Sequence, residues 1–428
     1  MSADPTPTGC GCPEGNLLTS AATVADGGLS RRGVLRGALL GGTALTVGSA
    51  VVTAAPIAAA ATQSAPWTLV VLSMRGAADG LSLVVPHGDP VYYSARPRVA
   101  IPKDRLLVAD AMFGLHPALA PLQSMWQQGK LAAVHAAGLP APNRSHFAAI
   151  EAVEDAAPGS STRSGWLNRL LGTDAYTSPL QGVAVGTSPF ALAAGAQPSL
   201  TVASVNAVRV AGASAVSTSD PRIASLARAW DADDLMGRGL RTAVTAVADY
   251  GAVRAAKDTT SSYPATSLGR ALALVSRSIR ADVGSSVVTV DHGNWDMHTD
   301  LGTVAGGWMT NQAGQFAAAV SAFFADLGSW ASRVTLVTVS EFGRRTVENA
   351  DHGLDHGWGS VMFLAGAGVN GGRYYGRWPG LTATGDADLP VTTDYRSVLA
   401  EVIGTRTSAS LATVFPGFTP QAVGVMRR

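Results

Sequence analysis

Residues 287–300 read VVTVDHGNWDMHTD, an apolar run that leads directly into a loop crowded with acids and histidines. The run at 287–290 has the continuous hydrophobicity of a strand buried on both faces, as in a parallel sheet covered by helices. The loop after it holds two acids and two histidines within eight residues: Asp291, His292, Asp296 and His298. Five of the chain's eight histidines lie in this loop and in two other short stretches, NRSHF at 143–147 and ADHGLDHGWG at 350–359.

The same design, a buried strand that runs into a loop with glycine or proline, occurs four more times. These strand candidates lie within residues 67–80, 130–147, 332–345 and 358–372. Helical patterns lie between them, at residues 116–129, 222–256, 265–283 and 311–330. Alternation of strands and helices is typical of βαβ units, so the sequence predicts an α/β fold with a central, mostly parallel sheet flanked by helices. Residues 182–208 are rich in small residues and favour β structure, but their pairing is not readable.

The N-terminal segment is predicted to be a targeting signal. Its motif SRRGVL at 30–35 is a twin-arginine export pattern, and residues 37–61 carry no charge. Small residues in A-x-A spacing then predict cleavage near Ala60 or Ala61. An uncleaved anchor is the alternative, because about 20 apolar residues can span a bilayer.

We therefore divide the chain into a twin-arginine signal peptide at 1–61 and a single domain at 62–428. Twin-arginine export carries folded proteins, so the domain would reach the cell envelope or the outside with any metal already bound. Cleavage would leave no integral membrane span. It would also remove Cys10 and Cys12, the only cysteines, and with them any disulfide, cysteine-bound zinc or thiol nucleophile. A net charge of +1 argues against nucleic-acid binding.

Polar loops follow four of the predicted strands, at the sheet edge where α/β proteins bind ligands. Carboxylates and imidazoles that converge there suit a divalent ion of Zn, Mn, Fe, Mg or Ca. The candidate residues are Asp79; Asn143, Arg144, Ser145 and His146; Asp291, His292, Asp296 and His298; Glu341 and Arg344; and a fifth group, Asp351, His352, Asp355 and His356, ahead of the last strand.

Several of these residues also have an ordinary structural interpretation. Asp79 can be a turn or helix-cap residue, Ser145 can cap a helix, and Glu341 can pair with a neighbouring arginine. The spacing of Asp296 and His298 is more specific, because residues two apart in an extended loop point to the same side. Both can therefore reach one ion.

Eight motifs occur in the order typical of the bacterial family called domain of unknown function 1501. They are GAADGLSLVVP (76–86), RSHF (144–147), GWLNRLL (165–171), NWDMH (294–298), SEFGRR (340–345), GLDHGWG (353–359), VNGGRYYG (369–376) and TTDYRSVLAEVIG (392–404). The resemblance extends from about Trp67 to the C-terminus. That family is similar to the alkaline phosphatase and sulfatase superfamily.

The resemblance implies an alkaline phosphatase-like domain with one or two divalent metal ions, of Zn, Mn, Ca or Mg, held by loops at one sheet edge. By order, the metal ligands would be Asp79, Asp296, His298, Glu341 and His356. Ser145 would stand where the nucleophile lies, and Arg144 would steady the oxygens of the transferred group. The chain departs from the superfamily at Glu341-Phe342, where Asp-His is usual. One imidazole is missing there, and His352 or His292 is the candidate replacement.

The function that follows is an exported, metal-dependent hydrolase of a small-molecule phosphate or sulfate ester. The alternative is a non-catalytic exported surface or assembly protein that keeps the fold and binds another exported protein. A Ser/His/Asp esterase is weaker, because no G-x-S-x-G elbow surrounds Ser145.

Overall fold

The computed structural model describes residues 43–47, 50–54, 64–158, 163–173, 178–186, 190–208, 221, 224–225, 228 and 235–427. The predicted export motif at 30–35 and both cysteines lie outside these residues. No helix in the described part of the chain combines the length and the apolar character needed to cross a membrane.

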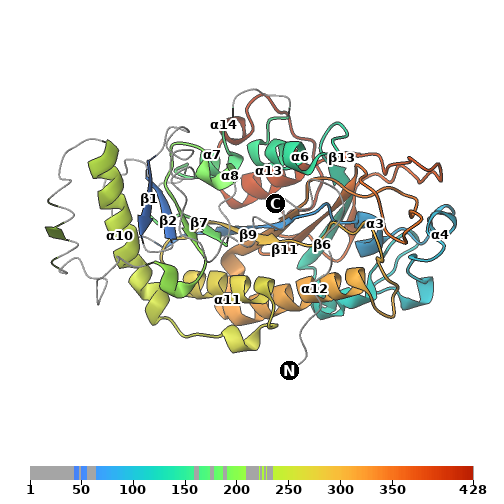
Figure 1. Cartoon of the computed structure of the whole chain (residues 1–428), viewed down its shortest axis with the longest axis horizontal. Helices are drawn as coiled ribbons and strands as arrows, with labels where there is room; N and C mark the ends of the chain where they lie inside the picture. Colours follow the sequence, from blue (N-terminus) through green and yellow to red (C-terminus); the bar gives the residue numbers. More distant parts are fainter. Residues whose placement is uncertain are drawn as a thin grey trace.

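A single mixed sheet runs through the molecule (Figure 1), with strand order β1-β2-β8-β7-β9-β3-β10-β11-β6-β12 and β13 beside β6. Its central strands β8, β7, β9, β3 and β10 are parallel to one another, and β11 is antiparallel to β10 and β6. Their bounds are β3 Thr68–Met74, β6 Leu131–Gly138, β7 Gly182–Val185, β8 Ser199–Val202, β9 Val287–His292, β10 Val334–Val339 and β11 Ser360–Gly366. The predicted α/β class with a mostly parallel sheet is confirmed.

The central strands are apolar on both faces, as the sequence predicts. Along β3, Val70, Leu72 and Met74 enter one core cluster, whereas Leu69 and Val71 enter another. Alternate side chains of a strand point to opposite faces, so the two clusters are the two sides of one sheet. All seven residues of β3 are buried.

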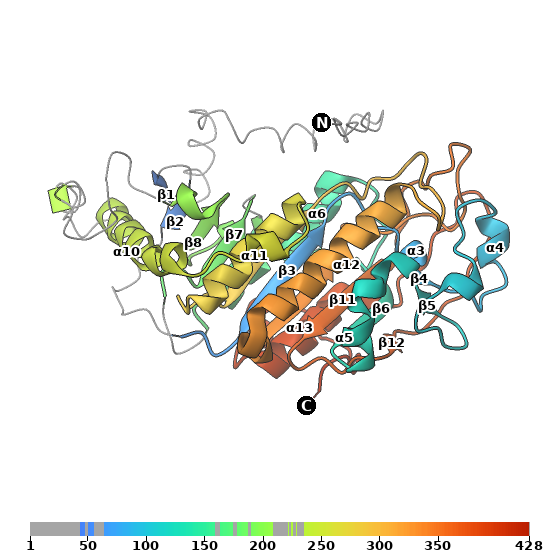
Figure 2. The same ribbon diagram turned by 90° about the horizontal axis from the view of Figure 1, so that it is seen from below.

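Helices cover both faces. Figure 2 shows α11 and α12 lying along one face, and Figure 1 places α6, α7, α8, α13 and α14 on the other. α11 begins after Thr266, whose side chain accepts from the Gly269 amide, and its buried stripe has the helical repeat of an amphipathic helix. The bounds are α6 His146–Asp155, α7 Trp166–Leu170, α8 Phe190–Ala193, α10 Leu235–Ala255, α11 Ser267–Arg280, α12 Trp308–Leu327, α13 Tyr395–Arg406 and α14 Leu411–Val414.

Short elements build the end of the molecule around β6. The predicted helix at 116–129 is two pieces, because Pro117 and Pro121 favour a 3-10 segment before the α-helical turn. The bounds are α3 Gly80–Leu83, β4 Val84–Val85, α4 Tyr92–Ala95, η2 Lys103–Arg105, β5 Gly114–Leu115, η3 Pro117–Leu122, α5 Gln123–Gln127, β12 Tyr374–Tyr375 and β13 Thr393–Asp394. The remaining 3-10 segments are η4 Val205–Ala207, η5 Thr260–Ser262 and η6 Gly328–Arg333.

Residues 182–208, whose pairing the sequence left open, supply two strands of the sheet. β7 and β8 are parallel to each other, and β7 lies beside β9. Each has only four residues, which is too short for a period to be read. A hairpin of β1 (Thr43–Val47) and β2 (Ala50–Ala54) then pairs with β8 at the sheet edge. This hairpin belongs to the predicted signal peptide, so cleavage near Ala60 would leave β8 as the edge strand.

Candidate metal centre

The polar loops after β3, β9 and β10 are joined to the loop before β11 by backbone hydrogen bonds. Two hydrogen bonds join the first two loops. The Arg75 amide donates to the His292 carbonyl, and the Trp295 amide donates to the Arg75 carbonyl. The Leu354 amide donates to Met297, and the Gly343 amide donates to Trp358. Loops that are far apart in sequence therefore meet at one sheet edge, as predicted.

Asp296 is the centre of a group of imidazoles. Its Oδ1 lies 3.5 Å from His146 Nε2, 3.0 Å from His298 Nε2 and 3.4 Å from His356 Nε2. His356 Nε2 also lies 3.1 Å from His146 Nε2 and 2.9 Å from His298 Nε2. We call these four residues the Asp296 cluster. Among the described residues, ligand atoms of His146, Asp296 and His356 all lie within 4.8 Å of one another, a spacing that could hold a metal ion.

The other nitrogen of each imidazole faces an oxygen. His356 Nδ1 lies 2.9 Å from the Arg144 carbonyl, and His298 Nδ1 lies 3.3 Å from Asp355 Oδ1. His146 Nδ1 faces Glu341 Oε1 at 3.7 Å, a contact longer than a hydrogen bond. A carbonyl oxygen only accepts, so His356 carries its proton on Nδ1 and, when neutral, turns the lone pair of Nε2 toward the cluster. Ligating histidines in metal sites are held in this way.

The charges of the cluster call for a cation. Burial alone raises the pKa of Asp296, but three imidazoles and the Arg344 guanidinium bring it far below its usual range. Burial lowers the pKa of His146, yet the nearby carboxylates of Asp296 and Glu341 raise it to about 9. Burial, helped by Arg344 and the other imidazoles, holds the pKa of His356 below its usual value. An ionised carboxylate and converging lone pairs favour a shared proton or a metal ion at the centre.

Glu341 lies behind His146 rather than among the converging ligand atoms. Its carboxylate is buried and accepts from the amides of Gly76 and Ala77, both at 2.9 Å. Burial raises the pKa of Glu341, but His146, the charge of Arg75 and the Gly76 amide lower it to about 2. In this arrangement the Glu341 oxygens bind backbone amides beside His146, whereas the resemblance implied a metal ligand.

Asp79 is not brought into the cluster. It caps α3 through the Ser82 amide, and Arg96 binds both of its oxygens, at 2.5 and 3.0 Å. Arg96 is itself fully buried and donates to the carbonyls of Thr346 and Arg345. Of the roles that the sequence left open for Asp79, the structure shows the helix cap, joined to a buried ion pair that sequence reasoning missed.

Ser145 and Arg144 lie at the rim of the cluster. Ser145 stands at the N-cap position of α6, directly before His146, and makes no side-chain cap hydrogen bond to the helix. The Arg144 carbonyl holds His356, and its partly exposed guanidinium pairs with Asp388. Arg144 therefore contacts the cluster through its backbone carbonyl, and Ser145 directly precedes one of the cluster's histidines.

His146 is the third imidazole of the Asp296 cluster, where the sequence had offered His352 or His292. His352 forms a backbone bridge to Thr299 with a left-handed φ of 58°, and it is not a member of the cluster. His292 is buried beside Gln312, where burial lowers its pKa to about 4. The signal for His146 was its place in RSHF, the polar loop after a buried strand.

Asp291, in the same loop as Asp296, has a different partner. Its Oδ1 accepts from Arg75 Nε at 3.1 Å, and Arg75 also binds Glu154 at 2.8 Å. Asp291 therefore pairs with an arginine, whereas Asp296 lies among the imidazoles.

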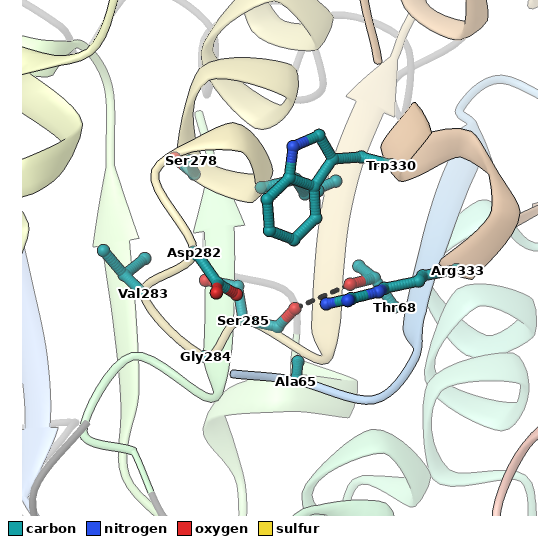
Figure 3. A pocket seen from close by; sticks show the side chains of 10 residues that line it. Ala65, Thr68, Ser278, Asp282, Val283, Gly284, Ser285, Trp330 and Arg333 are labelled. Atoms are coloured by element: carbon teal, nitrogen blue, oxygen red, sulfur yellow. Dashed lines mark hydrogen bonds between the residues drawn. The ribbon is translucent and has the colours of Figure 1, made fainter. Parts of the chain in front are cut away.

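A pocket at the opposite edge of the sheet has fewer side chains that could bind a metal ion or take part in catalysis. Thr68 and Ser285, near the starts of β3 and β9, meet there through a 2.8 Å hydrogen bond from the Thr68 hydroxyl to the Ser285 carbonyl, with Trp330 and Arg333 close by (Figure 3). Its cavity volume is about 10 Å³, room for about one water molecule. Small-molecule sites usually have about 300–1,000 Å³. No imidazole lines this pocket, so the Asp296 cluster is the stronger candidate.

Comparison with known protein families identifies a family for this chain. The family described as "Protein of unknown function (DUF1501)" matches residues 112–407. The matched segment contains the whole Asp296 cluster together with Glu341 and Arg344, but neither Asp79 nor Arg96. No curated protein matches the chain.

Proposed function

The chain belongs to the DUF1501 family, whose description gives no activity, and from the geometry of the Asp296 cluster we propose that it is an exported, metal-dependent hydrolase of a phosphate or sulfate ester. One observation carries the proposal: three imidazole Nε2 atoms lie within 3.5 Å of a single ionised carboxylate oxygen. The order of the motifs, which resembles that of the alkaline phosphatase and sulfatase superfamily, supplies the class of reaction.

The donor set fits a transition metal. His146, Asp296 and His356 would hold the ion, and His298 lies against the last two. Imidazole suits zinc and, with carboxylate, manganese, whereas calcium and magnesium prefer all-oxygen sites. We therefore narrow the expected metal to zinc or manganese.

A bound divalent ion would stabilise developing negative charge and lower the pKa of a hydroxyl beside it. In the proposed reaction, Ser145 Oγ bonds to phosphorus or sulfur as the bond to the alcohol oxygen breaks, and the alcohol leaves with a proton. Water then releases phosphate or sulfate and restores the serine. Arg144 would bind the oxygens of the transferred group with the part of its planar fork that Asp388 does not hold.

The test begins with the purified mature protein, metal analysis and a screen of phosphate and sulfate esters of p-nitrophenol. We expect Ser145→Ala to keep its metal and to lose hydrolysis by about a hundredfold or more. Ser332→Ala, a change of an exposed serine bonded to Ser329, is the matched control and should keep the activity. Metal-loaded protein that hydrolyses no ester would refute the hydrolase proposal.

Export has its own test. The motif SRRGVL predicts that changing Arg31 and Arg32 together to lysine blocks export of the precursor. Normal appearance of the mature protein outside the cell would argue against the twin-arginine route, and it would leave the proposed hydrolysis intact.

A non-catalytic exported surface or assembly protein is the second candidate. The observation that favours it is the engagement of Asp79 by Arg96 and of Glu341 by backbone amides, which removes two of the five ligands that the resemblance implies. Under this alternative, the Asp296 cluster would hold a structural ion. An exported partner protein recovered with the purified chain, together with inactivity toward every ester, would favour it.

A further inference from the structure

Arg344 lies against the Asp296 cluster but has no donor left for a substrate. Its guanidinium is buried, and its Nε donates to the Ala77 carbonyl at 2.8 Å. One terminal nitrogen donates to the Leu354 carbonyl at 3.0 Å and to His298 Nε2 at 3.2 Å. The other meets the carbonyls of Gly76 and Trp295 and also Asp296 Oδ1, the last at 2.6 Å. Arginine has five N–H groups, and all five have acceptors here.

The acceptors around this guanidinium are those that a metal ion would need. Four are backbone carbonyl oxygens, one is a carboxylate oxygen, and one is an imidazole nitrogen. Two of them, Asp296 Oδ1 and His298 Nε2, also belong to the Asp296 cluster. In two-metal enzymes the ions lie about 3.5–4 Å apart and share ligands in this way.

The rest of the site offers no other place for a second ion. The oxygens of Asp79 bind Arg96, and those of Glu341 bind the amides of Gly76 and Ala77. Within the described part of the chain, no second group of three histidine or acidic side chains converges on a point.

We propose that Arg344 occupies the position of a second metal ion, so that the native protein takes a single divalent ion, at His146, Asp296 and His356. The inference rests on the metal binding proposed above and deepens it. Arginine stays charged at every physiological pH, so the second positive charge is permanent and cannot leave with product. Because its N–H groups are all bonded, Arg344 is a positioning residue that keeps Asp296 ionised and holds His298. Only the single metal ion would face the substrate.

The experiment counts ions on the mature, full-length domain. The protein is stripped with a chelator and titrated with Co²⁺ and with Zn²⁺, and bound metal is measured by elemental analysis and, for Co²⁺, by visible absorption. We expect one ion per chain in the native protein. Arg344→Ala should take up two ions per chain, because the vacated space is lined by four carbonyls, a carboxylate and an imidazole. Arg344→Lys keeps the positive charge and should bind one.

Arg169→Ala is the matched control. Arg169 also donates to backbone carbonyls, those of Val414, Ser164 and Asp155, but it meets no imidazole. It should keep a stoichiometry of one. If Arg344→Ala does not fold without metal, two ions per chain in the native protein or in Arg344→Lys would still overturn the role of Arg344.

The outcomes separate the two proposals. Two ions per chain in the native protein, or one ion in folded Arg344→Ala, would overturn the role of Arg344 and leave the metal centre standing. No bound ion in the native protein would overturn the metal centre, and the role of Arg344 with it. One ion in the native, Arg344→Lys and Arg169→Ala proteins and two in Arg344→Ala support the inference.

Discussion

Asp79, which is buried, and Asp296, which is partly buried, are two aspartates in loops that follow neighbouring strands, and their partners give them opposite roles. Arg96 binds both oxygens of Asp79, and the Ser82 amide adds a third bond. Asp296 meets one nitrogen of Arg344 and three imidazoles. Their side chains are 2% and 14% exposed, so both charges need a partner.

The difference lies in the chemistry of the compensating charge. A guanidinium is always charged and offers only donors, so the Asp79 pair is closed to any other ligand. An imidazole can lose its proton and offer a lone pair, so the partners of Asp296 can exchange a proton for a metal ion. A buried acid after a strand therefore predicts that its charge is compensated, and the partner decides whether the result is structure or function.

The largest expected effect that separates the two sites is that of Asp296→Asn. The change removes the one carboxylate of the cluster and leaves neutral lone pairs around the centre. We expect the loss of bound metal and of any hydrolysis, and a chelator should no longer lower the melting temperature, because no ion stabilises the folded state. Metal analysis and thermal unfolding with and without chelator measure these effects. A normal metal content in Asp296→Asn would show that this loop is structural and does not bind the metal.

Asp79→Asn should lower the stability of the fold and leave the metal content unchanged. The substitution leaves the buried Arg96 without its counter-charge, and breaking a buried ion pair typically costs about 3–5 kcal/mol of unfolding free energy. The metal content should stay that of the native protein, because Asp79 contacts no member of the cluster. Urea unfolding and metal analysis of the same preparation measure both effects. Loss of metal from a folded Asp79→Asn protein would show that Asp79 supports the site after all.

This contrast shows how far the sequence leads. The continuous apolar runs at 287–290 and 69–72 predict central strands, because a strand buried on both faces has apolar side chains at successive positions. Asp296 and His298 were expected at one edge because the carboxyl ends of parallel strands meet there, whereas His356, which precedes β11, was expected as a ligand from the resemblance. The three residues do meet, because β11 is antiparallel and begins at that edge. The four-residue strands β7 and β8 carry too little pattern to be placed.

The local sequence does not predict which side chains pair with one another across the sheet edge. Arg96 follows the four-residue helix α4, and nothing in its neighbours marks it as the partner of Asp79. The sequence placed His146 next to the expected nucleophile, but its ring could equally have packed in the core. Only the folded chain brings it to Asp296 and His356, which are 150 and 210 residues away.

The pH dependence of stability offers a smaller and sharper comparison. Burial raises the pKa of Asp79, but the Arg96 guanidinium and the Ser82 hydrogen bonds lower it overall. The ion pair therefore stabilises the folded state fully above the unfolded carboxyl pKa, about 3.9, and this contribution is lost as the pH falls through the lower folded value. The stability gap between native protein and Asp79→Asn should be constant from pH 7 to about 5 and should narrow below that. If the difference in stability between the two proteins widened as the pH fell, the ion pair between Asp79 and Arg96 would not be its cause.

The smallest expected effect belongs to Asp291→Asn, in the loop that also carries Asp296. Asp291 binds Arg75, and both side chains are about one-fifth exposed, so solvent screens the pair. Arg75 keeps its bond to Glu154 when Asp291 is neutral, which limits the loss to about 0.5–1 kcal/mol. Metal content should not change, because neither Asp291 nor Arg75 contacts an imidazole of the cluster. Two acids of one short loop would then differ completely in their effect on metal and only modestly on stability. If Asp291→Asn loses metal as Asp296→Asn does, the ion is held by the loop as a whole, and the contrast between closed and exchangeable partners fails at this edge of the sheet.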